Sequence, residues 1–239
     1  MIRKIYLTVC QYLNNSKKIF RSAMMFKRIC MFVGGLFIMS FGVAFSIVST
    51  LGTTPISSIA YALALITNLS VGTTTFIFNA ALILIQFIIL RSRFHKKRIL
   101  QLISTFVFSY FIDLALYIVS FVPFDGSVLM MALFLAISIF LLALGIFIYM
   151  PTNIAPLPGE GCVEAIAIVT NWRFSTVKIA FDTTVVITAL IMCGLWYTDV
   201  FGAVYIGTIV SAFMVGFTLR QITNAYVHIT GNEANLVNE

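Results

Sequence analysis

The chain has 239 residues, of which 61% are hydrophobic and only 10% are charged, and its mean hydropathy is +1.05. So few polar side chains cannot cover the surface of a soluble domain, and the composition therefore indicates a polytopic membrane protein. The net charge is +7, but seven of the fifteen Lys and Arg residues lie in the first 28 positions and five more in 91–98. Clustering beside apolar runs is typical of the positive-inside rule and does not indicate a nucleic-acid partner.

In chain order, the sequence begins with a basic amphipathic arm (1–29), which we expect to lie on the cytoplasmic membrane surface. Six apolar runs follow, each long enough to cross a hydrocarbon core of ~30 Å. They lie at about 30–50, 72–90, 99–121, 129–150, 174–194 and 203–221, and a polar cytoplasmic tail (222–239) follows. Two shorter apolar segments, 54–68 and 158–171, come after the helix breakers "LGTTP" and "PTNIAPLPGEG". As helices they would reach only ~20 Å.

The basic segments predict the topology. If the arm and the 91–98 loop are both cytoplasmic, an even number of crossings separates them, and the runs 30–50 and 72–90 supply two. Segment 54–68 is then a re-entrant or broken helix that returns to its own side. The rival interpretation, in which the short helices cross fully, places 91–98 outside, against the charge rule. We therefore expect both termini in the cytoplasm.

An internal repeat appears at a constant offset of 103 residues. Pro55 falls on Pro158, Thr67-Asn68 on Thr170-Asn171, and Asn79 on Asp182. Each half, 30–121 and 129–221, reads as span, short helix, span, span. Three crossings per half predict that the second half is upside down relative to the first. The expected fold is therefore an all-α membrane protein of about six transmembrane helices in two inverted three-helix repeats.

Several of these stretches resemble a known family. "GVAFSIVSTLGTTPISSIAYAL", "VGTTTFIFNAALILIQ", "FSYFIDL" and the second-half elements "PGEG", "KIAFD" and "IGTIVSAFMVGF" are similar to the YczE/YyaS/YitT-like bacterial integral membrane proteins. The similarity covers nearly all of residues 30–221. It implies a bacterial inner-membrane protein of a group often described as transporters, without an established substrate or assigned binding residues.

The short helices are the strongest indication of a site. Paired interrupted helices in inverted repeats are typical of transporters that bind their substrate near the membrane midplane. The two N-termini would enter from opposite faces and converge, with Pro55 and Pro158 suited to the first helical turn. We expect the substrate-binding residues to be Ser57, Ser58, Asn79, Gly159, Glu160, Gly161, Glu164 and Asp182, with Asp113 and Lys178 as candidates for ion or proton coupling.

Each acidic residue also has a structural interpretation. Glu160 and Glu164 share one helix face, yet Glu160 in a first turn would also offset the helix dipole. Lys178 and Asp182, four residues apart, could simply neutralise one another. Asp113 is either a protonatable relay or the partner of a base elsewhere, such as Lys178 or Arg173.

The favoured function is an ion- or proton-coupled secondary transporter of a small polar solute. A zwitterion would suit both the helix N-termini and the carboxylates. The alternative is a non-catalytic accessory or scaffold membrane protein that acts through a partner. The chain lacks HExxH, GxSxG, GxGD and P-loop motifs, so we expect no enzyme activity, cofactor or metal. The expected partners are the lipid bilayer and the solute, and association into a homo-oligomer stays open.

Overall fold

The computed structural model describes residues 25–91, 96–197 and 202–230, and it is helical. Six helices are long and apolar enough to cross a membrane, in agreement with the predicted spans. They are α2 (Met25–Val48), α4 (Val71–Leu90), α5 (Leu100–Val119), α6 (Val128–Tyr149), α8 (Phe174–Trp196) and α9 (Ile206–Thr230). The protein is therefore an all-α polytopic membrane protein.

Two further helices, α3 (Pro55–Thr67) and α7 (Pro158–Thr170), have thirteen residues each. Both begin with proline at the first helical position, where the missing N–H costs nothing. Each ends before an asparagine, Asn68 or Asn171, in the left-handed conformation with φ 57° and ψ 21°. Asparagine tolerates this conformation and stops the helix there. At 1.5 Å per residue, each helix is about 20 Å long, too short to span the bilayer.

The two halves of the chain therefore have matching helix boundaries. α3 and α7 start and stop at positions 103 residues apart, and α4 and α8 also begin 103 residues apart. The helix packing is reciprocal, since α3 contacts α8 while α7 contacts α4. The inverted relation between the halves stays a prediction.

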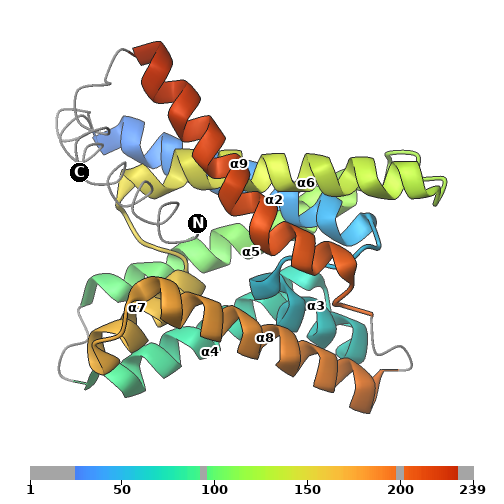
Figure 1. Ribbon diagram of the computed structural model, residues 1–239. Helices are drawn as coiled ribbons and strands as arrows, with labels where there is room; N and C mark the ends of the chain where they lie inside the picture. Colours follow the sequence, from blue (N-terminus) through green and yellow to red (C-terminus); the bar gives the residue numbers. More distant parts are fainter. Residues whose placement is uncertain (1–24, 92–95, 198–201, 231–239) are drawn as a thin grey trace.

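Figure 1 shows the helices in two layers, with α2, α6 and α9 above and α3, α4, α7 and α8 below. α5 lies between the layers and contacts both α2 and α4. α3 and α7 occupy opposite ends of the lower layer (Figure 1). The lower layer thus places the two short helices between the long helices α4 and α8.

Glycines allow the most extensive contact of the fold, that between α2 and α6. A Cβ atom at Gly35 would lie 2.7 Å from Cβ of Tyr149, and one at Gly145 would lie 2.8 Å from the carbonyl oxygen of Gly35. Gly42 meets Leu142 in the same way. At these positions the missing side chain lets the two helix backbones approach closely. Gly34 differs, because a Cβ atom there would meet nothing within 4 Å.

Two helix ends differ from the sequence prediction. α2 begins at Met25, inside the segment assigned to the basic arm, and residues 1–24 lie outside the described part. α9 continues to Thr230, well past the expected end at 221. The segment 222–230, "ITNAYVHIT", contains neither glycine nor proline, so nothing stops the helix when its hydropathy falls.

Candidate functional site

The N-termini of the two short helices lie against each other. A Cβ atom at Gly159, the second residue of α7, would lie 3.1 Å from Cδ1 of Ile56, the second residue of α3. Neither helix has a side-chain cap, because Thr54 and Leu157 form no capping hydrogen bond at the two N-cap positions. In α4 and α6, by contrast, Ser70 and Ser127 accept hydrogen bonds from backbone N–H groups. The convergence expected from the sequence is thus present, and it involves two uncapped helix starts.

Hydroxyl groups line the first turn of α3. The Thr54 hydroxyl donates to Ser57 Oγ at 2.9 Å, and the Ser58 hydroxyl donates to the carbonyl of Pro55 at 2.6 Å. Ser58 is fully buried, whereas Ser57 is partly exposed. Ser58 therefore stabilises its own helix, and Ser57 is the hydroxyl that remains accessible at this turn.

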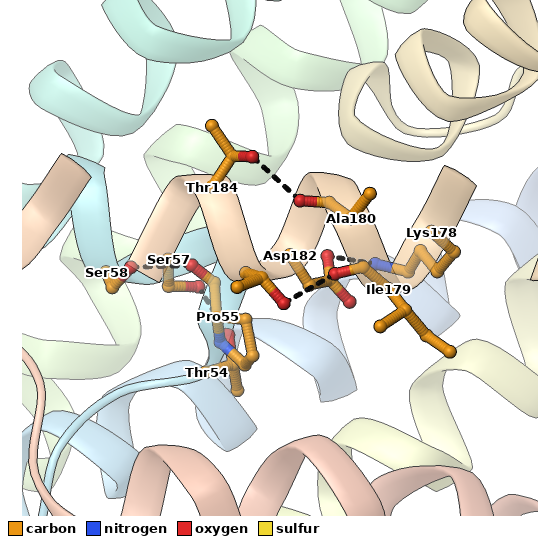
Figure 2. A network of polar contacts seen from close by, with 10 residues as sticks. Thr54, Pro55, Ser57, Ser58, Lys178, Ile179, Ala180, Asp182 and Thr184 are labelled. Carbon is orange, nitrogen blue, oxygen red and sulfur yellow. Dashed lines mark hydrogen bonds and ion pairs between the residues drawn. The ribbon is translucent and has the colours of Figure 1, made fainter. Parts of the chain in front are cut away.

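A lysine–aspartate pair on α8 lies beside this turn. Lys178 Nζ donates to Asp182 Oδ1 at 2.6 Å, one helical turn apart. Figure 2 shows the pair next to Thr54 and Ser57, where α8 passes α3. Both side chains are partly buried, with 30% and 25% exposure. Lys178 and Asp182 therefore neutralise one another, as one interpretation of the sequence predicts, close to the point where the two short helices meet.

Glu160 occupies the first turn of α7. Tyr149, a buried residue at the end of α6, donates its hydroxyl hydrogen to Glu160 Oε2 at 2.5 Å. Lys178 and Asp182 are close enough to Glu160 to interact with it electrostatically. In the part of the chain that the structure describes, Glu160 forms no ion pair. The side chain that donates a hydrogen bond to Glu160, that of Tyr149, is uncharged.

A polar clamp, formed by Gln86, Arg98 and Glu164, lies where α7 packs on α4. The Gln86 amide donates to the carbonyl of Pro158 at 3.1 Å. Arg98 Nη1 donates to Gln86 Oε1 at 2.9 Å and to the carbonyl of Gly161 at 3.1 Å. Arg98 Nη2 forms an ion pair with Glu164 at 3.0 Å, in which the Glu164 side chain is 51% exposed. Glu164 therefore faces Arg98, and the clamp holds α7 against α4 and the start of α5.

Gln101 lies beside this clamp with unused hydrogen-bonding capacity. It is fully buried, and neither its amide nitrogen nor its amide oxygen has a partner among the described residues. A Cβ atom at Gly161 would lie 2.6 Å from the Gln101 amide nitrogen and 2.8 Å from Gln86 Oε1. Only glycine lets these two amides lie so close to the first turn of α7. Unpaired buried amides are rare and costly.

Two predicted site residues remain, Asn79 and Asp113. Asn79 is buried on α4, the helix that packs on both α3 and α7. Asp113, on α5, accepts hydrogen bonds from the backbone N–H of Gly72 at 2.7 Å and from the Ser70 hydroxyl at 2.8 Å. Asp113 therefore stabilises the start of α4, where a carboxylate also offsets the helix dipole. It forms no contact with Lys178 or Arg173 among those that the structure describes.

Sequence reasoning missed Gln86, Gln101, Arg98 and Tyr149 as members of the site. Glutamines inside apolar spans are a detectable signal, since each places an amide in the membrane. From sequence, Arg98 belongs only to the basic loop, because its partner Glu164 is distant along the chain. Within the described residues, no group of three or more His, Cys, Asp or Glu side chains could hold a metal ion.

Comparison with known proteins agrees with the resemblance predicted from the motifs. The sequence model of a family described as a family of unknown function (DUF6198) matches residues 26–224. A Bacillus subtilis (strain 168) protein named "Uncharacterized protein YyaS" is 27% identical over 186 residues, which cover 78% of this chain and 87% of the relative. No solved structure matches the chain. The YyaS-like resemblance is thereby confirmed.

Proposed function

We propose that this chain, which belongs to the DUF6198 family, is an ion- or proton-coupled secondary transporter of a small polar solute. The observation that carries the proposal is the contact between two uncapped N-termini, Gly159 of α7 against Ile56 of α3. Irregular backbone at membrane depth is stable only where it is buried in protein or lines a water-filled cavity. Paired broken helices of this kind are typical of midplane transport sites.

The side chains around the contact support the same function. Ser57 contributes an accessible hydroxyl, Glu160 a carboxylate, and Lys178 with Asp182 an ion pair. Charged groups in a membrane protein are costly, so their concentration beside two helix starts favours a ligand-binding role over a purely structural one. We propose that the solute binds between α3, α7 and α8, and that the protein performs no covalent chemistry.

The proposed location is the bacterial inner membrane with both termini in the cytoplasm. This orientation rests on the basic residues of the N-terminal arm and of the loop at 91–98. The start of α2 and the ends of α4 and α9 lie toward one side of the molecule in Figure 1, which is consistent with it. In this arrangement α3 enters from the outside and α7 from the cytoplasm.

A transport assay tests the proposal. The purified full chain is reconstituted into liposomes, and uptake of a labelled amino-acid mixture, methylammonium and acetate is measured with and without inward proton or sodium gradients. We expect gradient-dependent uptake of at least one probe, reduced about tenfold or more by Glu160→Gln. Asp125→Asn is the matched control, because Asp125 is an exposed acid in the loop before α6, where its partner is the Ser127 backbone N–H.

The result that would overturn the proposal is equally specific. If none of these probes crosses with the wild-type protein, and Glu160→Gln instead changes which protein co-purifies with the chain, the accessory function replaces the transporter.

A further inference from the structure

The charged groups around the first turn of α7 do not balance. Arg98 is paired with Glu164, and Lys178 is paired with Asp182. Glu160 is left over, with a neutral tyrosine hydroxyl as its hydrogen-bonding side chain. With every group in its ionised form, these five charged residues sum to one negative charge, and the carboxylate without an ion pair among the described residues is that of Glu160.

An unbalanced charge beside buried side chains is unfavourable. Tyr149, which contacts Glu160, is buried, and Glu160 itself is only partly exposed. An isolated carboxylate in such surroundings is strongly destabilised unless a positive group approaches it. The helix start and the Tyr149 hydroxyl offset part of this charge, and a bound cation would neutralise it.

The geometry favours a primary ammonium group over a metal ion. The same region already holds an ammonium–carboxylate contact, since Nζ of Lys178 lies 2.6 Å from Oδ1 of Asp182. A primary ammonium has three donors, which the carboxylate of Glu160 and a hydroxyl such as that of Ser57 can accept. An alkali or divalent ion instead requires several convergent oxygen ligands, and the described residues provide no cluster of carboxylates.

Gln101 is independent evidence that this turn is incomplete without a ligand. It is fully buried, its two amide atoms are unpaired, and it faces Gly161, the residue after Glu160. A buried amide without a partner costs free energy, and a bound molecule or its water can supply that partner. The first turn of α7 thus holds one unpaired charge, on Glu160, and faces one unpaired amide, that of Gln101, across Gly161.

We propose that the solute carries a single primary ammonium group, for which Glu160 provides the counter-charge. This inference rests on the proposed function, since it names the substrate class of the same site. Lys178 then acts as a tethered competitor, because its own ammonium lies within electrostatic range of Glu160. The solute ammonium replaces that long-range attraction with direct contact.

Three small probes of similar shape and different charge test the inference: propylammonium, propionate and propionamide. Thermal unfolding of the purified full chain in detergent is followed at increasing concentrations of each probe. Propylammonium is expected to raise the unfolding temperature in a saturable way, and the other two are not. Sodium, potassium and N-methylglucamine chlorides at equal ionic strength distinguish an ammonium site from a metal-ion site.

Two variants give opposite expected results. Glu160→Gln should weaken propylammonium binding about tenfold or more, because the counter-charge is lost. Lys178→Gln should tighten it several-fold, since the competing ammonium is removed and Asp182 is freed. The control Asp125→Asn should leave the affinity unchanged. A variant that fails to fold does not block the test, because the other variant predicts a shift of the opposite sign.

The inference is overturned if propionate or propionamide stabilises the protein as well as propylammonium does. It is also overturned if sodium alone stabilises it, if no probe does, or if Glu160→Gln leaves propylammonium binding intact. These outcomes are separable from failure of the transporter proposal. If propylammonium binds in a Glu160-dependent way but no probe is taken up, the ammonium site is supported and the transport proposal is rejected. If acetate is taken up but propylammonium does not bind, transport is supported and the ammonium site is rejected.

Discussion

The surroundings of α3 and α7 differ sharply although the two helices have the same length, the same proline start and the same asparagine stop. α3 packs on an apolar cluster that includes Ala189 and Val204. α7 packs on Gln86 and Gln101, which occupy the corresponding positions 103 residues earlier. The two helices thus have the same backbone ends, but α3 contacts apolar side chains and α7 contacts the amides of two glutamines. Apolar packing therefore holds α3 in place, whereas hydrogen bonds and one ion pair hold α7.

The largest effect on stability is expected when a polar side chain replaces an apolar one in the cluster on which α3 packs. Ala189 is fully buried, so Ala189→Gln would bury an amide without a partner and overpack the cluster. We expect the free energy of unfolding in mixed micelles to fall by about 4 kcal/mol. Ala189→Met has similar volume without the amide and should cost clearly less. Equal losses for the two variants would show that volume alone, and not polarity, separates the two regions.

Opening the polar clamp should have the next largest effect. Arg98→Met removes three hydrogen bonds and leaves the buried oxygen of Gln86 without its donor. The expected loss is about 2–3 kcal/mol by the same unfolding measurement. Lys27→Met, which removes an exposed charge at the start of α2, serves as the control. Unchanged stability in Arg98→Met would mean that the clamp does not hold α7.

Removing the unpaired amide should have the opposite sign. Gln101→Leu replaces a buried group that has no partner, so we expect a gain of about 1 kcal/mol in the free energy of unfolding. Gln86→Leu, the same substitution at a fully bonded glutamine, should instead destabilise the protein. A loss of stability in Gln101→Leu would contradict the view that this amide lacks a partner.

The smallest effect is expected at Asp113, outside the convergence of the short helices. Asp113→Asn keeps one acceptor for the Gly72 N–H but loses the charge that favours the start of α4. The expected cost is about 0.5 kcal/mol, without any change in gradient-dependent uptake. Uptake under an imposed pH gradient measures proton coupling. Loss of that coupling in Asp113→Asn would show that Asp113 takes part in proton transfer.

The backbone of both regions was predictable from sequence, whereas their contacts were not. Pro55, Pro158 and the Thr-Asn pairs mark the ends of the short helices, because proline and asparagine restrict local backbone conformation. Glu160 stood out because acidic residues are rare in apolar segments. No local pattern, however, shows that Arg98 reaches Glu164 across 66 positions, or that Tyr149 is the partner of Glu160.

Neutral polar residues were the weakest point of the sequence interpretation. Gln86 and Gln101 do not alter net charge and barely interrupt the hydropathy of their spans. Their importance depends on Gly161, whose missing side chain lets both amides approach α7. That dependence is a property of tertiary packing and cannot be read from periodicity.

The central claim is that α3 and α7 enter the membrane from opposite faces and meet at their N-termini. Single cysteines at Thr67 and Thr170, the exposed equivalent last residues of the two helices, test it directly in a chain whose native cysteines are replaced. Labelling with a membrane-impermeant maleimide is compared in right-side-out and inside-out vesicles. Our account predicts that position 67 is labelled only from the outside and position 170 only from the cytoplasmic side. Labelling of both from the same side would contradict it.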